Sequence, residues 1–219
     1  MTPERDPRLR GLYFITPPVP EGADPRATHL ENSRAALRGG ARLIQFRDKV
    51  LTGEARAAIA RELVALAHAH GALCIINDDT ELAARVEADG VHLGRDDPDP
   101  AAARMRLGPG AMVGVSCYNE LERARAALAD GASYAAFGSV FPSPTKPDAV
   151  RAELDLFREA RAKLELPICA IGGITPENAS DVVAAGADMV AVIQGVSAAP
   201  DPEAAAHRIA GLFNPGETD

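Results

Sequence analysis

Tryptophan is absent from the 219-residue chain, and aromatic residues make up only 4% of it. Apolar residues still reach 47% and charged residues 25%, which is ordinary for a globular protein. The core must therefore be mainly aliphatic. The length suits one large domain or two small ones.

Cysteine is scarce as well, with only Cys74, Cys117 and Cys169. Their odd number, wide spacing and lack of a CxxC pair argue against a disulfide framework and against a zinc site. Cys74 and Cys169 lie in apolar runs, which indicates buried thiols. Cys117 follows Ser116 with no histidine evidently nearby, so we do not expect a nucleophilic thiol.

Long apolar runs and excess positive charge are also missing. No stretch approaches the ~20 apolar residues of a membrane helix, and the first residues, MTPERDPRLRG, contain no apolar signal segment. We therefore expect a cytoplasmic protein with no membrane partner. The 23 Lys and Arg residues against 31 Asp and Glu leave a net charge of −8, so nucleic-acid binding is not expected. An anionic ligand would need cations that are concentrated locally.

The chain does contain eight short apolar runs at fairly even spacing. They are nearly continuous, which is typical of parallel strands that are covered on both faces. Ala-, Glu- and Arg-rich stretches with helical periodicity lie between most of them, for example 53–71 and 119–131. Gly71, Gly131 and Gly186 are expected to end such helices. The runs are 12–16, 41–47, 73–77, 90–94, 112–116, 134–138, 167–173 and 189–193.

Strands that alternate with helices in this way predict the α/β class and a single (β/α)8 TIM barrel. We expect this one domain to span residues 1–219, with short flexible termini at about 1–10 and 214–219. An open doubly wound sheet is the alternative, which the absence of a GxGxxG motif after the first strand weakens. No linker or low-complexity segment divides the chain.

The chemistry of a barrel gathers where its strands end. Gln45, Arg47 and Lys49 alternate at the end of the second run, so a strand would place them on one face and Phe46 on the other. Two such cations could be ordinary surface charges. Lys146, in a separate loop at the same end, favours a shared polyanion such as a diphosphate.

Two aspartates, Asp78 and Asp97, follow neighbouring predicted strands. Aspartates in this position often cap helices, a role that is also open to Asp79 or Asp96. Beside a phosphate-binding cluster they would suit Mg²⁺, which takes one or two carboxylates together with phosphate oxygens and water. Both interpretations stay open from the residues alone.

The GGITPEN segment after the seventh run has a structural and a functional interpretation. Thr175 is expected to cap the next helix, with Pro176 in its first turn. Gly173 would let the backbone approach a ligand, because the loops after strands seven and eight of a barrel commonly bind phosphate. Among the histidines, His29 has the pattern of a surface helix residue, and His92 that of a core or supporting residue within a strand.

Taken together, these motifs resemble those of the thiamine-phosphate synthase (thiamine-phosphate pyrophosphorylase) family, in family order across about residues 11–213. The matching segments are QFRDK (45–49), IINDD (75–79), ADGVHLGRDD (88–97), VGVSCYN (113–119), AFGSVFPSPTKP (136–147), AIGGITPEN (170–178) and GADMVAVI (186–193).

The resemblance implies a Mg²⁺-dependent transferase of thiamine biosynthesis on a (β/α)8 barrel. Such an enzyme joins 4-amino-2-methyl-5-(diphosphooxymethyl)pyrimidine to a thiazole phosphate. The products are thiamine phosphate, diphosphate and, from the carboxylated thiazole, CO2. In this family the diphosphate leaves first, and the thiazole nitrogen then attacks a carbocation-like pyrimidine.

The resemblance also implies roles for residues of this chain. Asp78 and Asp97 would bind Mg²⁺, and the catalytic residues would be Arg47, Lys49, Ser116 and Lys146. The pyrimidine diphosphate would be held by Gln45, Phe46, Arg47, Asp48, Lys49, Asn77, Ser116 and Lys146. The thiazole phosphate would be held by Ser143, Pro144, Thr145, Gly173, Ile193 and Gln194, although serine is usual in the family where Gln194 stands.

Two rival functions share the same barrel. A thiazole tautomerase-like paralogue would need acid–base groups rather than diphosphate-binding cations. A non-catalytic sensor of phosphate ligands would keep the pocket without the chemistry. In each case the partners are small molecules, and a homo-oligomer is possible.

Overall fold

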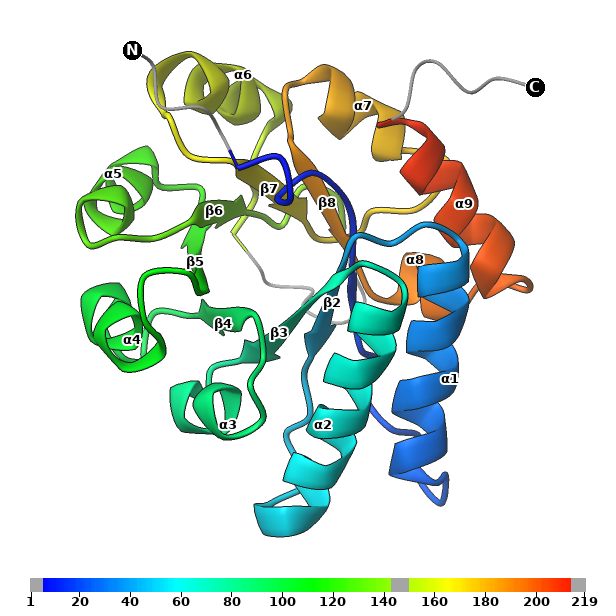
Figure 1. Ribbon diagram of the computed structural model, residues 1–219. Coiled ribbons are helices and arrows are strands. Elements are labelled where there is room, and N and C mark those ends of the chain that lie inside the picture. The colour runs from blue at the N-terminus through cyan, green and yellow to red at the C-terminus, as the bar shows by residue number, and fades with distance from the viewer. Residues whose placement is uncertain (1–5, 143–149, 214–219) are drawn as a thin grey trace.

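The computed structural model describes residues 6–142 and 150–213. Eight parallel strands close into a barrel in chain order, with β1 paired to β8 (Figure 1). The (β/α)8 prediction is thus confirmed. The strands are β1 Gly11–Ile15, β2 Leu43–Phe46, β3 Leu73–Asn77, β4 Gly90–Leu93, β5 Met112–Tyr118, β6 Tyr134–Phe137, β7 Ile168–Ile171 and β8 Met189–Val192.

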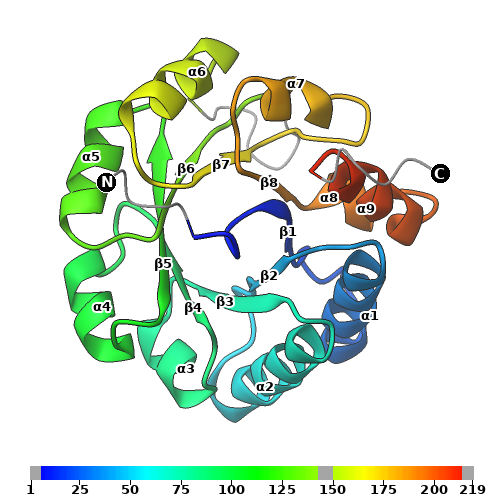
Figure 2. The same ribbon diagram turned by 45° about the horizontal axis from the view of Figure 1, so that its top comes forward.

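The helices surround the barrel as an outer ring (Figure 2). The glycine stop signals are confirmed: Gly71, Gly131 and Gly186 follow the C-caps of three helices with positive φ values of 67°, 86° and 106°. The helices are α1 Pro25–Arg38, α2 Gly53–Ala69, α3 Thr80–Arg85, α4 Pro100–Leu107, α5 Leu121–Ala129, α6 Leu154–Lys163, α7 Ala179–Ala184, α8 Gln194–Ser197 and α9 Pro202–Gly211.

The helix caps match the sequence prediction at one loop and differ at another. Asp79 caps α3, accepting from the Leu82 N–H at 2.8 Å. Thr175 does not cap a helix, because α7 begins only at Ala179 and the Thr175 hydroxyl accepts from the Glu177 N–H within a turn. The local spacing of Thr and Pro did not reveal this extra turn.

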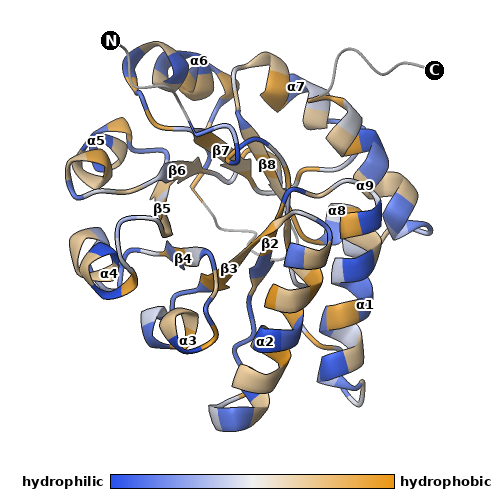
Figure 3. Cartoon of the chain, in the orientation of Figure 1, coloured by the Kyte–Doolittle hydropathy of each residue, from blue (hydrophilic) through white to orange (hydrophobic). Residues whose placement is uncertain are grey.

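Two apolar layers hold the barrel together. The outer layer lies between strands and helices and includes Phe14, Phe46 and Leu63, whereas the inner layer fills the barrel and includes Leu43 and Ile75. Successive strand residues alternate between the layers, because their side chains point to opposite faces. Figure 3 shows the strands mostly in hydrophobic colours, while α1 and α2 mix hydrophobic and hydrophilic residues.

The segment before β1 lies over the centre of the ring of strands (Figure 2). Its Leu9 is 1% exposed and packs in the inner layer, so ordered contacts begin before residue 11. Leu43, Met112 and Met189 fill the same end of the barrel, where the strands begin. The extent of a single domain over 1–219 stays a prediction.

His29 corrects a sequence-based interpretation. It is fully buried on α1, where its ring packs edge-on against Phe46 at 5.2 Å, rather than lying on the surface. Among the described helices, none is long and apolar enough to cross a bilayer.

Candidate functional site

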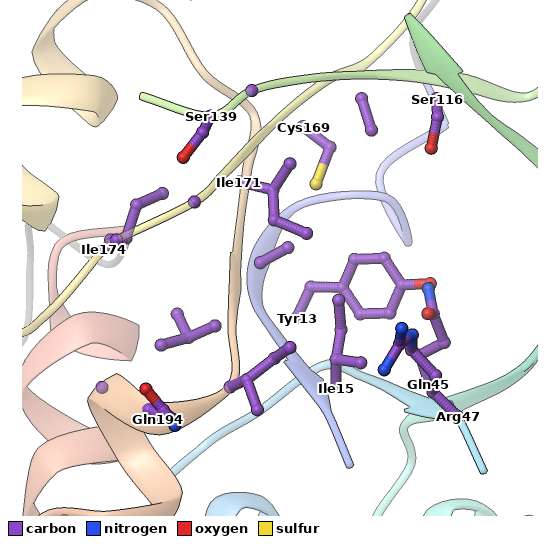
Figure 4. A pocket seen from close by; sticks show the side chains of 18 of the residues that line it. Tyr13, Ile15, Gln45, Arg47, Ser116, Ser139, Cys169, Ile171, Ile174 and Gln194 are labelled. Carbon is purple, nitrogen blue, oxygen red and sulfur yellow. The ribbon is translucent and has the colours of Figure 1, made fainter. Parts of the chain in front are cut away.

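A cavity of about 470 Å³ opens where the strands end, and all eight strands contribute to its wall (Figure 4). Small side chains on the inner face, such as Ala136 and Ala191, leave this space unfilled. Seven of the residues predicted from sequence line it: Gln45, Arg47, Asn77, Ser116, Gly173, Ile193 and Gln194.

The end of β2 supplies an amide and a cation to the same wall. Gln45 is 2% exposed, and its amide nitrogen donates to the Tyr13 hydroxyl at 2.7 Å. Arg47 lies beside it, two residues further along the strand direction (Figure 4). Phe46 points outward into the helix layer, as the alternation predicted, so its side chain does not contribute to the cavity.

Asp48 turns away from the cavity into its own loop. Its carboxylate accepts from the N–H groups of Val50 and Leu51 at 2.8 and 2.6 Å and lies 2.8 Å from the His29 ring nitrogen. Burial acts to raise the pKa of Asp48, but these hydrogen bonds outweigh it and hold the pKa below its usual value. Asp48 therefore organises the loop between β2 and α2, and Lys49 beside it is exposed.

The loops after β3 and β4 bring two carboxylates together. Burial, followed by the hydrogen bond and charge of Asp97, raises the pKa of Asp78 to about 6, while the charge of Lys49 opposes this. Asp78 also has a left-handed backbone with φ of 65°. Asp97 is oriented by the Gly94 N–H, which donates to its Oδ2 at 2.6 Å.

This carboxylate pair fits a divalent cation. Burial is the main cause of the raised pKa of Asp78, and the contact with Asp97 adds to it, because two neighbouring carboxylates repel each other when both are ionised. A bound cation would relieve that repulsion. Within the described ranges, no group of three or more His, Cys, Asp or Glu side chains could hold a metal. Such a pair needs further oxygens from substrate and water, a coordination that is typical of Mg²⁺.

Sequence reasoning missed two tyrosines of the inner face. The Tyr13 and Tyr134 hydroxyls are 2.9 Å apart, and Tyr134 also lies 3.0 Å from Nδ1 of His92. Nε2 of His92 in turn lies 2.9 Å from the Ser116 hydroxyl. The period-two alternation of β1 and β6 could have placed both tyrosines inward, but not their contact across the barrel.

The opposite wall of the cavity is formed after β7 and β8, where Gln194 and Ile174 lie across from Arg47 (Figure 4). Strand β8 ends at Val192, one residue before the end of the predicted run 189–193, and Gln194 begins the short helix α8. Gly173 has φ of 64°, and a Cβ there would lie 2.4 Å from the Pro142 carbonyl oxygen. Its missing side chain thus lets the loops after β6 and β7 pack together.

Four predicted residues, Ser143, Pro144, Thr145 and Lys146, lie outside the described residues. The described residues on either side of them, Pro142 and Val150, both line the cavity.

The burial predicted for Cys74 and Cys169 is confirmed, and Cys117 is buried as well. Burial raises the pKa of the Cys117 thiol to about 12 and also raises that of Cys169, which lines the cavity.

Comparison with known proteins identifies the family. The profile described as "Thiamine monophosphate synthase" matches residues 12–196, which is most of the chain. The chain belongs to the thiamine monophosphate synthase family. It is accordingly an enzyme, a transferase of thiamine biosynthesis that acts on small molecules.

Relatives in this family match nearly the whole chain. A protein named thiamine-phosphate synthase from Thioalkalivibrio sulfidiphilus is 55% identical over 210 residues, covering 96% of this chain and 98% of that protein. One from Chromobacterium violaceum is 56% identical, covering 94% and 98%. The solved thiamine phosphate pyrophosphorylase from Pyrococcus furiosus superposes with a TM-score of 0.83 at 32% identity, covering 95% and 98%.

Proposed function

We propose that this cavity joins an aminopyrimidine diphosphate to a thiazole phosphate, with each substrate on its own wall. The observation that carries the proposal is the gathering of Gln45, Arg47, Asn77 and Ser116 in one wall, opposite Gln194. The carboxylate pair Asp78 and Asp97 follows the neighbouring strands.

The pyrimidine diphosphate binds along the wall that is formed by β2, β3 and β5. Gln45 and Asn77 are mostly buried and offer amide groups to the heterocycle. Arg47 and the exposed Lys49 bring positive charge toward the diphosphate, and Ser116 offers a hydroxyl. Lys146 adds a third cation, a role that rests on the family resemblance and on the cavity contacts of Pro142 and Val150.

Asp78 and Asp97 hold Mg²⁺ in this proposal. The mutual repulsion of the two carboxylates supports a cation between them. When bound, Mg²⁺ supplies positive charge that stabilises the departing diphosphate.

The thiazole phosphate binds the opposite wall, at Gly173, Ile193 and Gln194, with Ser143, Pro144 and Thr145 as further contacts from the resemblance. The start of a short extra helix after β8 supports this assignment, because barrels often bind phosphate there. Gln194 stands where the family usually has serine and offers a longer amide donor.

The chemistry is a dissociative displacement. The C–O bond to the diphosphate breaks first, with the pyrimidine amino group stabilising the resulting cation. The thiazole nitrogen then forms the new C–N bond, and a carboxylated thiazole loses CO2. The protein needs no nucleophile for this route, and its cations act by stabilising the developing negative charge.

Incubation of the purified protein with both substrates and Mg²⁺, followed by measurement of released diphosphate, tests the proposal. We expect release that requires the thiazole phosphate and stops on chelation of the metal. Tautomerisation of the thiazole without diphosphate release would instead favour a thiazole tautomerase-like paralogue. Binding of the substrates without turnover would favour a non-catalytic sensor of phosphate ligands.

Cytoplasmic localisation and self-association stay predictions of the sequence, to be tested by cell fractionation and sedimentation.

A further inference from the structure

A chain of four hydrogen bonds crosses the inside of the barrel. It runs from Gln45 to Tyr13 at 2.7 Å and from Tyr13 to Tyr134 at 2.9 Å. It continues from Tyr134 to His92 at 3.0 Å and from His92 to Ser116 at 2.9 Å. Both of its ends, Gln45 and Ser116, line the cavity.

The packing of the inner layer fixes this chain in place. Tyr13 and Tyr134 are 1% and 0% exposed, and their rings meet edge-on at 6.0 Å. The Tyr134 ring stacks on His92 at 5.6 Å. A Cβ on Gly114 would lie 2.0 Å from Cζ of Tyr134, so glycine at this position makes room for the ring.

The donors and acceptors can be counted from the Gln45 end. Its amide nitrogen donates to the Tyr13 oxygen, and among the described residues the buried Tyr13 proton has no acceptor other than Tyr134, so Tyr13 donates to Tyr134. Tyr134 then donates to Nδ1 of His92. Nδ1 therefore carries no proton, and the neutral ring must carry its proton on Nε2 and donate it to Ser116.

A charged imidazolium breaks this order. Both ring nitrogens would then donate, so Tyr134 would have to turn its proton toward Tyr13. The buried Tyr13 proton would then have no acceptor among the described residues, at the cost of an unsatisfied donor. Burial also lowers the pKa of His92 to about 4, in agreement with a neutral ring.

We propose that Tyr13, Tyr134 and His92 are positioning residues that set the polarity of the two cavity-facing ends of the chain. Ser116 accepts from His92, so its own proton is directed to the ligand. Gln45 donates an amide proton to Tyr13, so the side-chain carbonyl oxygen of Gln45 is turned toward the ligand as an acceptor.

This polarity matches a specific class of ligand. Ser116 presents a donor to an anionic oxygen, and Gln45 presents an acceptor to an amino group on a neutral heterocycle. The inference rests on the proposed function for the identity of that ligand, but the proton order itself does not depend on it.

The tautomer of His92 tests the proton order directly. In ¹⁵N-histidine-labelled protein near neutral pH, with His92→Gln to assign the signal, we expect a protonated Nε2 and an unprotonated Nδ1. Tyr13→Phe should keep this tautomer, because Tyr134 still donates to Nδ1. Tyr134→Phe should remove this preference and give a mixture of the two His92 tautomers. A protonated Nδ1 in the unsubstituted protein overturns the inference, whether or not the protein makes thiamine phosphate.

A double-mutant cycle tests whether Tyr134 acts through Ser116. Tyr134→Phe should lower kcat about tenfold, the effect of one lost hydrogen bond in the transition state. In the Ser116→Ala variant, the added Tyr134→Phe change should lower kcat little further. Full additivity would mean that Tyr134 only supports the fold, and this would overturn the inference. Absence of diphosphate release by the unsubstituted protein would reject the proposed function alone, leaving the proton order to be decided by the tautomer.

Discussion

The backbone of Arg47 fixes its position, since no ion pair within residues 6–142 and 150–213 involves its guanidinium. Its N–H donates to the Thr16 hydroxyl at 2.9 Å, and that hydroxyl donates back to the Arg47 carbonyl at 3.1 Å. Thr16 is fully buried at the end of β1. These two hydrogen bonds extend the contact between β1 and β2 beyond the strand ends. They fix the backbone position from which the Arg47 side chain extends.

Loss of the Arg47 side chain should affect chemistry more than binding. A preorganised donor aimed at developing charge contributes about 3–4 kcal/mol where measured, so Arg47→Ala should lower kcat by roughly 10²–10³-fold. The matched control is Arg42→Ala, an exposed arginine directly before the same strand. Diphosphate-release kinetics check both, and an unchanged kcat for Arg47→Ala would reject the role assigned to Arg47.

At the scale of elements, the loop between β2 and α2 is held by the Asp48 carboxylate. Asp48 binds two backbone N–H groups and the His29 ring, whose other nitrogen is buried without a hydrogen-bond partner among the described residues. The loop carries Arg47 and Lys49, so its order supports the placement of both cations.

Removal of the Asp48 carboxylate should cost both stability and substrate binding. Three hydrogen bonds at about 1 kcal/mol each predict a loss of about 3 kcal/mol for Asp48→Ala. Its KM for the pyrimidine diphosphate should rise because the loop loses its shape. Urea denaturation and initial rates measure the two effects. The exposed Asp130→Ala should change stability by only about 0.5 kcal/mol.

The start of α8 gives a second prediction at this scale. Gln194→Ala should raise the KM for the thiazole phosphate several-fold, by removing one amide donor worth about 1 kcal/mol. The KM for the pyrimidine diphosphate should stay the same, because Gln194 lies on the opposite wall from Gln45. Equal changes in both KM values would contradict separate walls.

Repeating patterns in the sequence predicted most elements of this fold. Near-continuous apolar runs located all eight strands, and the glycines marked the ends of helices such as α2 and α5. Boundaries that depend on tertiary contacts were missed. The start of α7 depends on a turn in which the Asn178 side chain accepts from the Thr175 N–H, which no local spacing signals.

At the scale of the whole molecule, the positions of the strand ends in the sequence were enough to predict several cavity residues. The predicted Gln45, Arg47, Asn77 and Ser116 all line one cavity, because parallel strands bring their carboxyl ends together. The orientation of Asp48 and the burial of His29 could not be predicted, since each depends on a partner 19 residues away in the chain.

Stability should depend on pH through His92. Its pKa in the folded protein, about 4, is lowered mainly by burial from the ordinary 6.5, so the unfolded chain binds more protons between these values. The contribution of neutral His92 to the free energy of unfolding is complete above about pH 6.5 and is lost as the pH falls toward 4. Between about pH 4.5 and 6.5 this change amounts to roughly 2 kcal/mol.

Urea denaturation of the His92→Gln variant checks this dependence. Between about pH 4.5 and 6.5, the free energy of unfolding of the unsubstituted protein should rise relative to that of the variant, which lacks the His92 contribution. Asp78 acts with the opposite sign, because its folded pKa is raised to about 6 by burial and by Asp97, but it is present in both proteins and cancels. The exposed His207→Gln serves as the control and should keep the unsubstituted profile. Parallel curves for His92→Gln and the unsubstituted protein would contradict the prediction.

Leu9, together with Leu43, Met112 and Met189, closes the barrel at the end where the strands begin. Substrates must then enter, and products leave, at the opposite end, where Gln45 is buried and Gln194 is exposed. A thiazole phosphate that arrives first would obstruct the pyrimidine diphosphate behind it. Initial-rate patterns should therefore show compulsory order, with the pyrimidine adding first and excess thiazole phosphate acting as an inhibitor.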